Sequence, residues 1–270
     1  MSLSNVRRRA NGAELYILRG APNDRQMELS ICKKIVDAFS FRRSGMLFHE
    51  KRKYVFISVP KTGTSAVEKH ITGLDQQVCH NTVKKSDGQW VRVAKHASAR
   101  QIKCLLGEQA DQFRFVAFFR DPRELVLAKY NWYRNGLAYK RWKNGRLPFF
   151  TPNHNWWKPS LAHRVLFARF LPFSIWLRFY PFKPNAHFVA NIQGQLDVDF
   201  FGLFENLQRD FIRIFTNFGY APEQLTLPRE NVTKYENYSA DLDLVDRIVR
   251  NRCGQDLALI EEWKARNGGL

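Results

Sequence analysis

The stretch KYVFISVPKTGTSAVEKH, Lys53–His70, joins an apolar run to a polar turn and then to a helical pattern. The run Tyr54–Val59 is rich in β-branched and aromatic residues and ends at Pro60, which predicts a short buried strand. After the turn, Ser65 opens a helical pattern, and either Thr64 or Ser65 can cap the helix. The segment therefore predicts a strand, a tight turn and a helix in direct succession.

Two further segments repeat this arrangement. The run Phe113–Phe119 is followed by Arg120–Pro122, in which the aspartate can cap a helix and the proline can take its first position. The run Phe200–Phe204 reads as a third strand, and apolar residues keep helical spacing over Leu207–Phe218. Each strand is thus expected to run directly into a helix.

Apolar strands that alternate with amphipathic helices predict an α/β fold, in which helices flank a central parallel sheet in a P-loop-like, three-layer arrangement. We expect a single domain over residues 1–270, with an insertion at about residues 136–198 and a last packing helix over Ala240–Trp263. Ligands of such folds bind at the carboxyl ends of the strands. Lys61 and Arg120 both follow predicted strands and are expected there.

Composition points to an anionic partner. The chain of 270 residues carries a net charge of +18 at pH 7, and no Asp or Glu occurs between Leu125 and Leu196. Such a charge favours nucleic acid, an anionic membrane surface, or an acidic small molecule or polymer. The four cysteines form no CxxC pair and no spacing typical of metal ligands, so neither a zinc site nor a disulfide framework is expected.

The sequence contains no stretch typical of a secretory signal, because the basic N-terminus lacks an apolar segment. The segment Leu166–Phe182 is apolar and aromatic, but arginines and prolines interrupt it, so it is not expected to span a membrane. It could form a lid or lie on a membrane surface. We expect a cytoplasmic protein able to associate with membranes, or a Golgi-lumenal one if the sequence is trimmed from a eukaryotic chain.

The turn Pro60–Ser65 has the composition of a phosphate cradle. A turn from a strand into a helix presents unpaired backbone N–H groups and the positive end of the helix dipole to an anion. Gly63 lets the backbone approach closely, and Lys61 adds a positive charge. In the ATP-type motif GxxxxGK[ST], the lysine instead follows the second glycine and precedes a magnesium-binding hydroxyl. We therefore expect a nucleotide phosphate site without a required metal. Hydroxyl donors are offered by Thr62, Thr64 and Ser65.

With the second motif, FRFVAFFRDPRELVLAKYNWYR at residues 113–134, the chain resembles a known family. It is similar to the sulfotransferases that use 3′-phosphoadenosine 5′-phosphosulfate (PAPS), in the carbohydrate type 2 branch of heparan and chondroitin sulfate enzymes and their bacterial relatives. The resemblance runs from about Tyr54 to Trp263, with a poorly matched middle over residues 136–198. Further similar segments are AKHASARQIKCLLG at residues 94–107 and FFGLFENLQRDF at residues 200–211.

The resemblance implies that Pro60–Ser65 binds the 5′-phosphosulfate of PAPS and that Arg120 binds its 3′-phosphate. The product would be adenosine 3′,5′-bisphosphate (PAP), and no metal would be required. The family places a serine on the 3′-phosphate eight residues after the arginine, where this chain has Ala128. One hydrogen bond to a charged group is worth roughly 1.5–3 kcal/mol, so we expect weaker binding or a divergent donor. Arg120 could act alone or with Lys129, Arg229 or Lys234.

Sulfuryl transfer needs in-line placement of the acceptor hydroxyl, stabilisation of the charge on the leaving phosphate, and a base for the hydroxyl proton. Lys61 and the N–H groups of the turn would stabilise the charge. His96 matches a segment that carries a catalytic histidine in the related 2-O-sulfotransferases. His70 and Glu68 are the alternatives, because other carbohydrate sulfotransferases place a His or Glu about this far along the helix.

The acid-free stretch, residues 125–196, is the expected acceptor region. Its tryptophans can stack on sugar rings, and its arginines and lysines can pair with carboxylates or sulfates. The expected acceptor is an anionic saccharide or, because of the Phe-rich segment Leu166–Phe182, a glycolipid at a membrane surface. The same residues could equally form a basic solvated insertion with a local aromatic core.

Two other classes stay open. A P-loop kinase or NTPase would need a magnesium-binding acidic residue at a strand end, where only Asp121 and Glu205 qualify. A non-catalytic nucleic-acid or polyanion-binding module would explain the charge and the interleaved aromatics. It would not explain a phosphate turn and an Arg-Asp-Pro corner on successive strand ends, so nucleic acid is not the expected partner.

Overall fold

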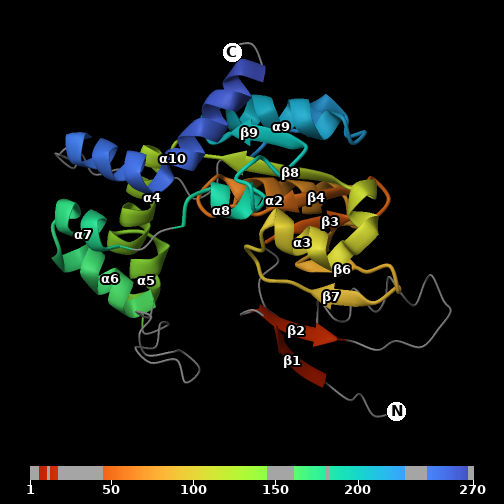
Figure 1. Ribbon diagram of the computed structural model, residues 1–270, viewed down its shortest axis with the longest axis horizontal. Coiled ribbons are helices and arrows are strands. Elements are labelled where there is room, and N and C mark those ends of the chain that lie inside the picture. Colours follow the sequence, from red (N-terminus) through yellow and green to blue (C-terminus); the bar gives the residue numbers. More distant parts are fainter. Residues whose placement is uncertain are drawn as a thin grey trace. The chain divides into compact units, whose positions relative to one another are not determined.

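The computed structural model describes residues 6–10, 13–17, 45–144, 161–180, 183–228 and 242–266. By their contacts, the residues divide into two units. Figure 1 labels most of the helices and strands. Unit 1 comprises Met1–Phe119 and His187–Glu230, and unit 2 comprises Arg120–Ala186 and Asn231–Leu270. Unit 2 therefore takes in most of the expected insertion together with the helix that follows Arg120 and the C-terminal helix. The single domain stays a prediction.

Unit 1 is built on a five-stranded mixed sheet with the strand order β5-β3-β4-β8-β9. The three predicted strands are neighbours and run parallel, with Ile57 opposite Ala117 and Phe118 opposite Gly202. The α/β class is thus confirmed. The strands are β3 (Leu47–His49), β4 (Tyr54–Ile57), β5 (Cys79–His80), β8 (Arg114–Phe119) and β9 (Phe200–Leu203).

The expectation of a purely parallel sheet is wrong on one side of β4. There β3 pairs antiparallel with β4, and β5 pairs antiparallel with β3. The cause is the short connection of residues 50–53 between β3 and β4, because a parallel pair needs a crossover of a dozen or more residues. A second, antiparallel sheet has the order β1-β2-β7-β6, from β1 (Val6–Ala10), β2 (Ala13–Ile17), β6 (Thr82–Lys84) and β7 (Trp90–Arg92).

Phenylalanines fill the core of unit 1. Phe56 of β4 and Phe118 of β8 are fully buried, and they share a cluster with Phe211 and Phe215 of α9 and with Val67 of α2. Burial of one such side chain stabilises the fold by about 1.5–3 kcal/mol. The helical elements of this unit are α2 (Thr64–Leu74), α3 (Ala99–Leu106), η1 (Gly107–Gln112), α8 (Ala186–Val189, beginning at the unit boundary), η2 (Phe204–Asn206), α9 (Leu207–Thr216) and η3 (Pro222–Gln224).

Unit 2 is helical and has its own aromatic core. Asp121 caps α4 as expected, because its carboxylate accepts the N–H groups of Arg123 at 2.8 Å and Glu124 at 3.4 Å, with Pro122 in the first position. The buried ring of Trp176 stacks on Tyr180 with centroids 4.4 Å apart. The helices are α4 (Pro122–Arg134), α5 (Leu137–Lys143), α6 (Leu161–Phe170), α7 (Phe173–Phe179) and α10 (Leu242–Arg266, kinked at Cys253).

The apolar segment Leu166–Phe182 does not form one helix. Leu171 and Pro172 separate α6 from α7, since proline cannot continue a helix that precedes it. Within the described ranges, no helix has both the length and the apolar character needed to cross a bilayer.

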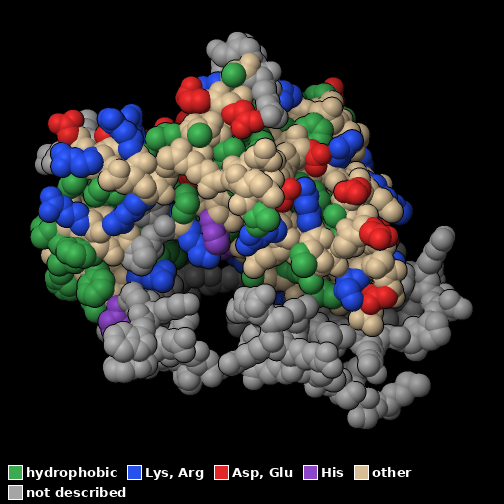
Figure 2. All heavy atoms as spheres, in the orientation of Figure 1, with side chains coloured by type: hydrophobic (Ala, Val, Ile, Leu, Met, Phe, Trp, Pro, Cys, Tyr) green, Lys and Arg blue, Asp and Glu red, His purple; other side chains and the backbone are tan. Residues whose placement is uncertain are grey.

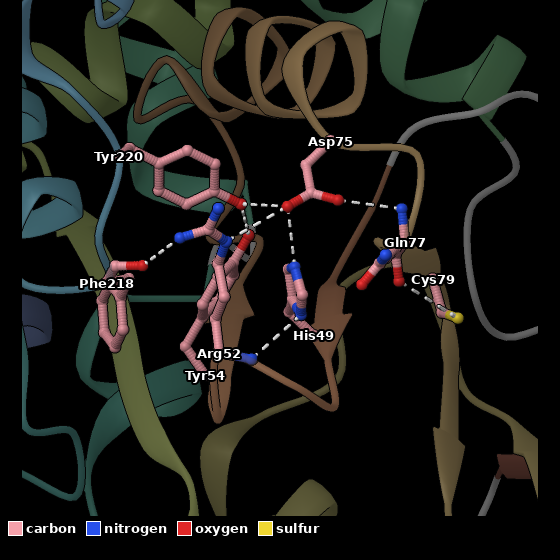
Figure 3. Close-up of polar contacts among 8 residues, drawn as sticks. All are labelled: His49, Arg52, Tyr54, Asp75, Gln77, Cys79, Phe218 and Tyr220. Atoms are coloured by element: carbon pink, nitrogen blue, oxygen red, sulfur yellow. Dashed lines mark hydrogen bonds and ion pairs between the residues drawn. The ribbon is translucent and has the colours of Figure 1, made fainter.

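A polar network in unit 1 fixes the C-terminal end of α2 (Figure 3). Asp75, the residue after α2, accepts hydrogen bonds from His49 Nε2 at 2.9 Å and Arg52 Nε at 3.1 Å. The N–H of Arg52 donates to His49 Nδ1 at 3.2 Å, so the hydrogen of the neutral ring is on Nε2. Arg52 also donates to the carbonyl of Phe218 beyond α9, and its guanidinium lies 4.2 Å from the ring centroid of Tyr220. The network ties α2 to the β3–β4 turn and to the segment after α9.

Replacement of Asp75 by Ala should lower the free energy of unfolding by about 2–4 kcal/mol, because His49 and Arg52 lose a shared, largely buried acceptor. Urea unfolding at pH 7.5 measures this effect. The matched control is Asp87→Ala, which removes the exposed pair of Asp87 with Lys85 and should cost much less, because solvent screens that pair. Equal losses in the two variants would contradict the role given to the network.

The network should also make the protein sensitive to acid. Burial lowers the pKa of His49 below its usual 6.5. Between pH 6.5 and the lower pKa of the folded state, only the unfolded state takes up the proton, so stability falls as the pH falls. Burial tends to raise the pKa of Asp75, but hydrogen bonds from His49 and Gln77 outweigh it and hold the pKa below 3.8. The contribution of Asp75 is therefore lost only at lower pH, as the carboxylate is protonated.

Candidate functional site

The turn between β4 and α2 has two residues in the left-handed backbone region. Lys61 has a φ of 70°, and Gly63, the N-cap of α2, has a φ of 76°. The expected cap by the side chain of Thr64 or Ser65 is wrong, since α2 begins at Thr64 without a side-chain cap hydrogen bond. The carbonyl of Gly63 instead accepts the N–H of Ala66 at 3.0 Å.

Gly63 is required by the fold itself. A Cβ at this position would lie 2.5 Å from Leu207 Cδ2 and 3.1 Å from the ring of Phe204, and the positive φ disfavours other residues. Lys61 has no such freedom, and a non-glycine residue at positive φ costs on the order of 1 kcal/mol or more. Backbone strain of this kind clusters at ligand-binding sites. The strained residue of the turn is the lysine expected to meet an anion.

The hydroxyl groups of the turn are not equivalent. Thr62 is fully buried, and its Oγ1 donates to the carbonyl of Val59 at 3.0 Å, so it braces the turn from inside. Thr64 is 5% exposed, whereas Lys61 and Ser65 are half-buried. The first N–H groups of a helix have no acceptor within it. An anion at this turn would therefore meet backbone N–H groups, Ser65 and Lys61 rather than Thr62.

Ser58, the residue after β4, joins two of the expected base candidates. Its hydroxyl donates to Glu68 Oε1 at 2.6 Å, and its carbonyl accepts a hydrogen bond from His96 Nδ1 at 2.6 Å. Since a carbonyl can only accept, Nδ1 carries hydrogen, and Nε2 of a neutral His96 is left as the basic nitrogen. Sequence reasoning missed Ser58, although it is the one serine in the run YVFISV.

Glu68 lies on the buried side of α2 and is only 1% exposed. Burial raises the pKa of its carboxyl to about 7, although the hydrogen bond from Ser58 and the charge of Lys95 act in the opposite direction. The carboxyl therefore changes its charge near neutral pH. Because it is buried, it can influence a ligand only through neighbours such as Ser58.

His70 lies on a different face of α2, because two residues along a helix differ by about 200° in direction. Its Nε2 is 2.5 Å from the carbonyl oxygen of Gln224. It also lines a shallow pocket of about 330 Å³, whose other residues are Lys69, Gly73, Leu74, Thr226, Leu227 and Pro228. The structure thus brings Glu68 and His96 together at Ser58 and leaves His70 out.

Of the residues expected at the 3′-phosphate, the structure describes Arg120, Ala128 and Lys129, all in unit 2. Arg120 is 7% exposed, its Nη2 lies 3.4 Å from Glu124 Oε2, and its carbonyl accepts from Asn185 Nδ2 at 3.0 Å. Ala128 is buried on α4 and offers no polar group. Lys129 Nζ donates to the carbonyl of Lys183 at 2.9 Å, and burial lowers the pKa of this lysine to about 8. Lys234 and Arg229 lie outside the described residues.

Comparisons of the chain with protein-family models, with curated proteins and with solved structures found no match. The described parts of the chain contain no cluster of three or more His, Cys, Asp or Glu residues that could hold a metal ion. The sulfotransferase resemblance stays a prediction, and any function has to be argued from the residues of this chain.

The buried carboxyl of Glu68 should make stability fall as pH rises from about 4.5 to 7. In that range the unfolded state has lost the proton and the folded state keeps it. Glu68→Gln removes this penalty. The free energy of unfolding of the variant, taken relative to that of the wild type at the same pH, should therefore be about 2–3 kcal/mol higher at pH 8 than at pH 5. Urea unfolding of both proteins at the two pH values measures the difference. A difference that does not change with pH would contradict a raised pKa.

Proposed function

We propose that the protein is a PAPS-dependent sulfotransferase that moves a sulfuryl group to a hydroxyl of a carbohydrate or glycoconjugate. The single observation that carries the proposal is the hydrogen bond from His96 Nδ1 to the carbonyl of Ser58. It holds the ring of a histidine base against Ser58, which lies three residues before Lys61 at the start of the turn that leads into α2. The parallel strands β4, β8 and β9, with α2 directly after β4, support a P-loop-like arrangement.

The residues of the turn fit the 5′-phosphosulfate end of this donor. The first N–H groups of α2, Ser65 and Lys61 supply donors and positive charge, the chemistry that binds phosphate at helix N-termini. PAPS, when bound, supplies the activated sulfuryl group. Arg120 is the proposed partner of the 3′-phosphate, either alone or with Lys129, Arg229 or Lys234. Ala128 removes one donor relative to the family that the chain resembles.

The protein groups have separate tasks in the proposed reaction. His96 Nε2 accepts the proton of the acceptor hydroxyl, a role suited to a neutral imidazole near neutral pH. Lys61 and the N–H groups of the turn stabilise the charge that develops on the leaving phosphate. Ser58 holds the ring of His96, and Glu68 positions Ser58. The acceptor is proposed to be an anionic saccharide or glycolipid, which the basic residues of the acid-free stretch would pair with.

Transfer of radiolabel from PAPS to partly desulfated heparin or chondroitin tests the function. His96→Ala should lower turnover by about a hundredfold or more, as expected for loss of a general base, and should leave PAP binding intact. His70→Ala is the matched control and should keep its activity, because His70 faces Gln224.

Three results would contradict the proposal in different ways. A fully active His96→Ala enzyme would overturn the assignment of the base. Loss of activity in His70→Ala alone would move that role to His70. Absence of transfer by the wild type, together with salt-sensitive binding of polyanions and indifference to PAP, would favour the non-catalytic binding module.

A further inference from the structure

Helices α6 and α7 of unit 2 present large hydrophobic side chains to solvent. Phe167 is 50% exposed and Phe170 75% exposed on α6, while Ile175 is 41% and Phe179 78% exposed on α7. Solvent-facing side chains of this size are normal when they occur singly. Four of them on two consecutive helices are a feature that needs a cause.

The four side chains form one outward stripe on each helix. Phe167 and Phe170 are three residues apart, and Ile175 and Phe179 four apart, the spacings that place residues on the same helix face. The opposite faces pack into the core of unit 2 through residues such as Val165 and Leu177. Hydrophobic side chains gather over α6 and α7 in Figure 2.

The charged side chains of α6, of α7 and of the neighbouring α5 are all cationic. Arg169 lies between Phe167 and Phe170 in the sequence, Arg178 lies just before Phe179, and both arginine side chains are exposed. Lys140 and Lys143 are exposed on α5, the helix that contacts α6. The chain has no Asp or Glu from residue 125 to residue 196. An apolar stripe on helices whose own charged residues are all cations matches the chemistry of an interfacial helix on an anionic membrane.

We propose that the α6–α7 face, formed by Phe167, Arg169, Phe170, Ile175, Arg178 and Phe179, docks on the surface of an anionic lipid bilayer. The apolar side chains enter the boundary between headgroups and acyl chains, and the arginines pair with the lipid phosphates and with anionic headgroups. This proposal does not depend on the sulfotransferase activity. It assigns a place of action at which a lipid-linked acceptor would be within reach.

A bilayer fits this face better than a second copy of the chain. In a two-fold dimer the same patch meets itself, so Arg169 and Arg178 of one copy would approach those of the other. The acid-free stretch contains no carboxylate to separate them. An anionic surface accepts both the apolar side chains and the arginines.

Co-sedimentation with vesicles of phosphatidylcholine, with or without phosphatidylserine, tests the proposal. The wild type should bind the serine-containing vesicles more tightly. Phe170→Ser with Phe179→Ser should weaken this binding about tenfold or more. Arg169→Gln and Arg178→Gln should each weaken it about fivefold and reduce the preference for phosphatidylserine.

The matched controls are Ile192→Ser and Arg100→Gln, which change exposed residues of unit 1 and should leave binding unchanged; Ile192 is 75% exposed. Circular dichroism and transfer to a soluble saccharide should be the same in the Phe170/Phe179 double variant and the wild type. Loss of vesicle binding with transfer intact would separate the two proposals.

Equal vesicle binding by wild type and double variant would overturn the proposal. So would equal affinity of the wild type for neutral and anionic vesicles. Lipid-free dimers that the double variant abolishes would make a second copy the occupant, and RNA binding that it abolishes while vesicle binding persists would make nucleic acid the occupant.

Discussion

The parallel pairing of β4 with β8 is the constraint on which the candidate site depends. β4 is buried between β3 and β8, and the register that sets Ile57 opposite Ala117 fixes where the chain leaves the sheet. Ser58, the first residue after β4, is fully buried, so its polar groups need partners inside the protein. His96 and Glu68 provide them. The contacts that satisfy a buried serine are therefore the same contacts that orient the proposed base.

The helix after this turn is held at both ends. At its start, Gly63 packs against Leu207, and at its end Asp75 enters the network with His49 and Arg52. Both attachments involve α9 or the segment that follows it. A helix fixed in this way presents its N-terminal N–H groups at a defined position, which binding of a phosphate requires. These attachments also hold the turn in place, so Lys61 can keep its unfavourable positive φ.

Long, strongly patterned features could be predicted from the sequence. The strands near Tyr54 and Phe113, the cap at Asp121 and the helical spacing that leads to Phe215 all follow from local signals. Short strands such as β3 and β5 lack enough residues for such a signal. The cap of α2 was mispredicted because Gly63 takes the N-cap position in a left-handed conformation.

The candidate site could be predicted only in part, since its central contact is tertiary. Lys61 and His96 stand out by residue type, but the bond between His96 and Ser58 spans 38 residues and leaves no local pattern. The burial of Glu68, which raises its pKa to about 7, likewise depends on what packs against α2. Helical spacing does separate Glu68 from His70, and that separation was available from the sequence.

Calorimetric titration of PAP, without metal, into the wild type, Lys61→Ala and Lys69→Ala tests the central claim most directly. Lys69 is the matched control, an exposed lysine on α2. A phosphate site at the turn predicts micromolar binding to the wild type and to Lys69→Ala, and binding at least about tenfold weaker to Lys61→Ala. No binding, or equal binding by all three proteins, would contradict a donor site at this turn.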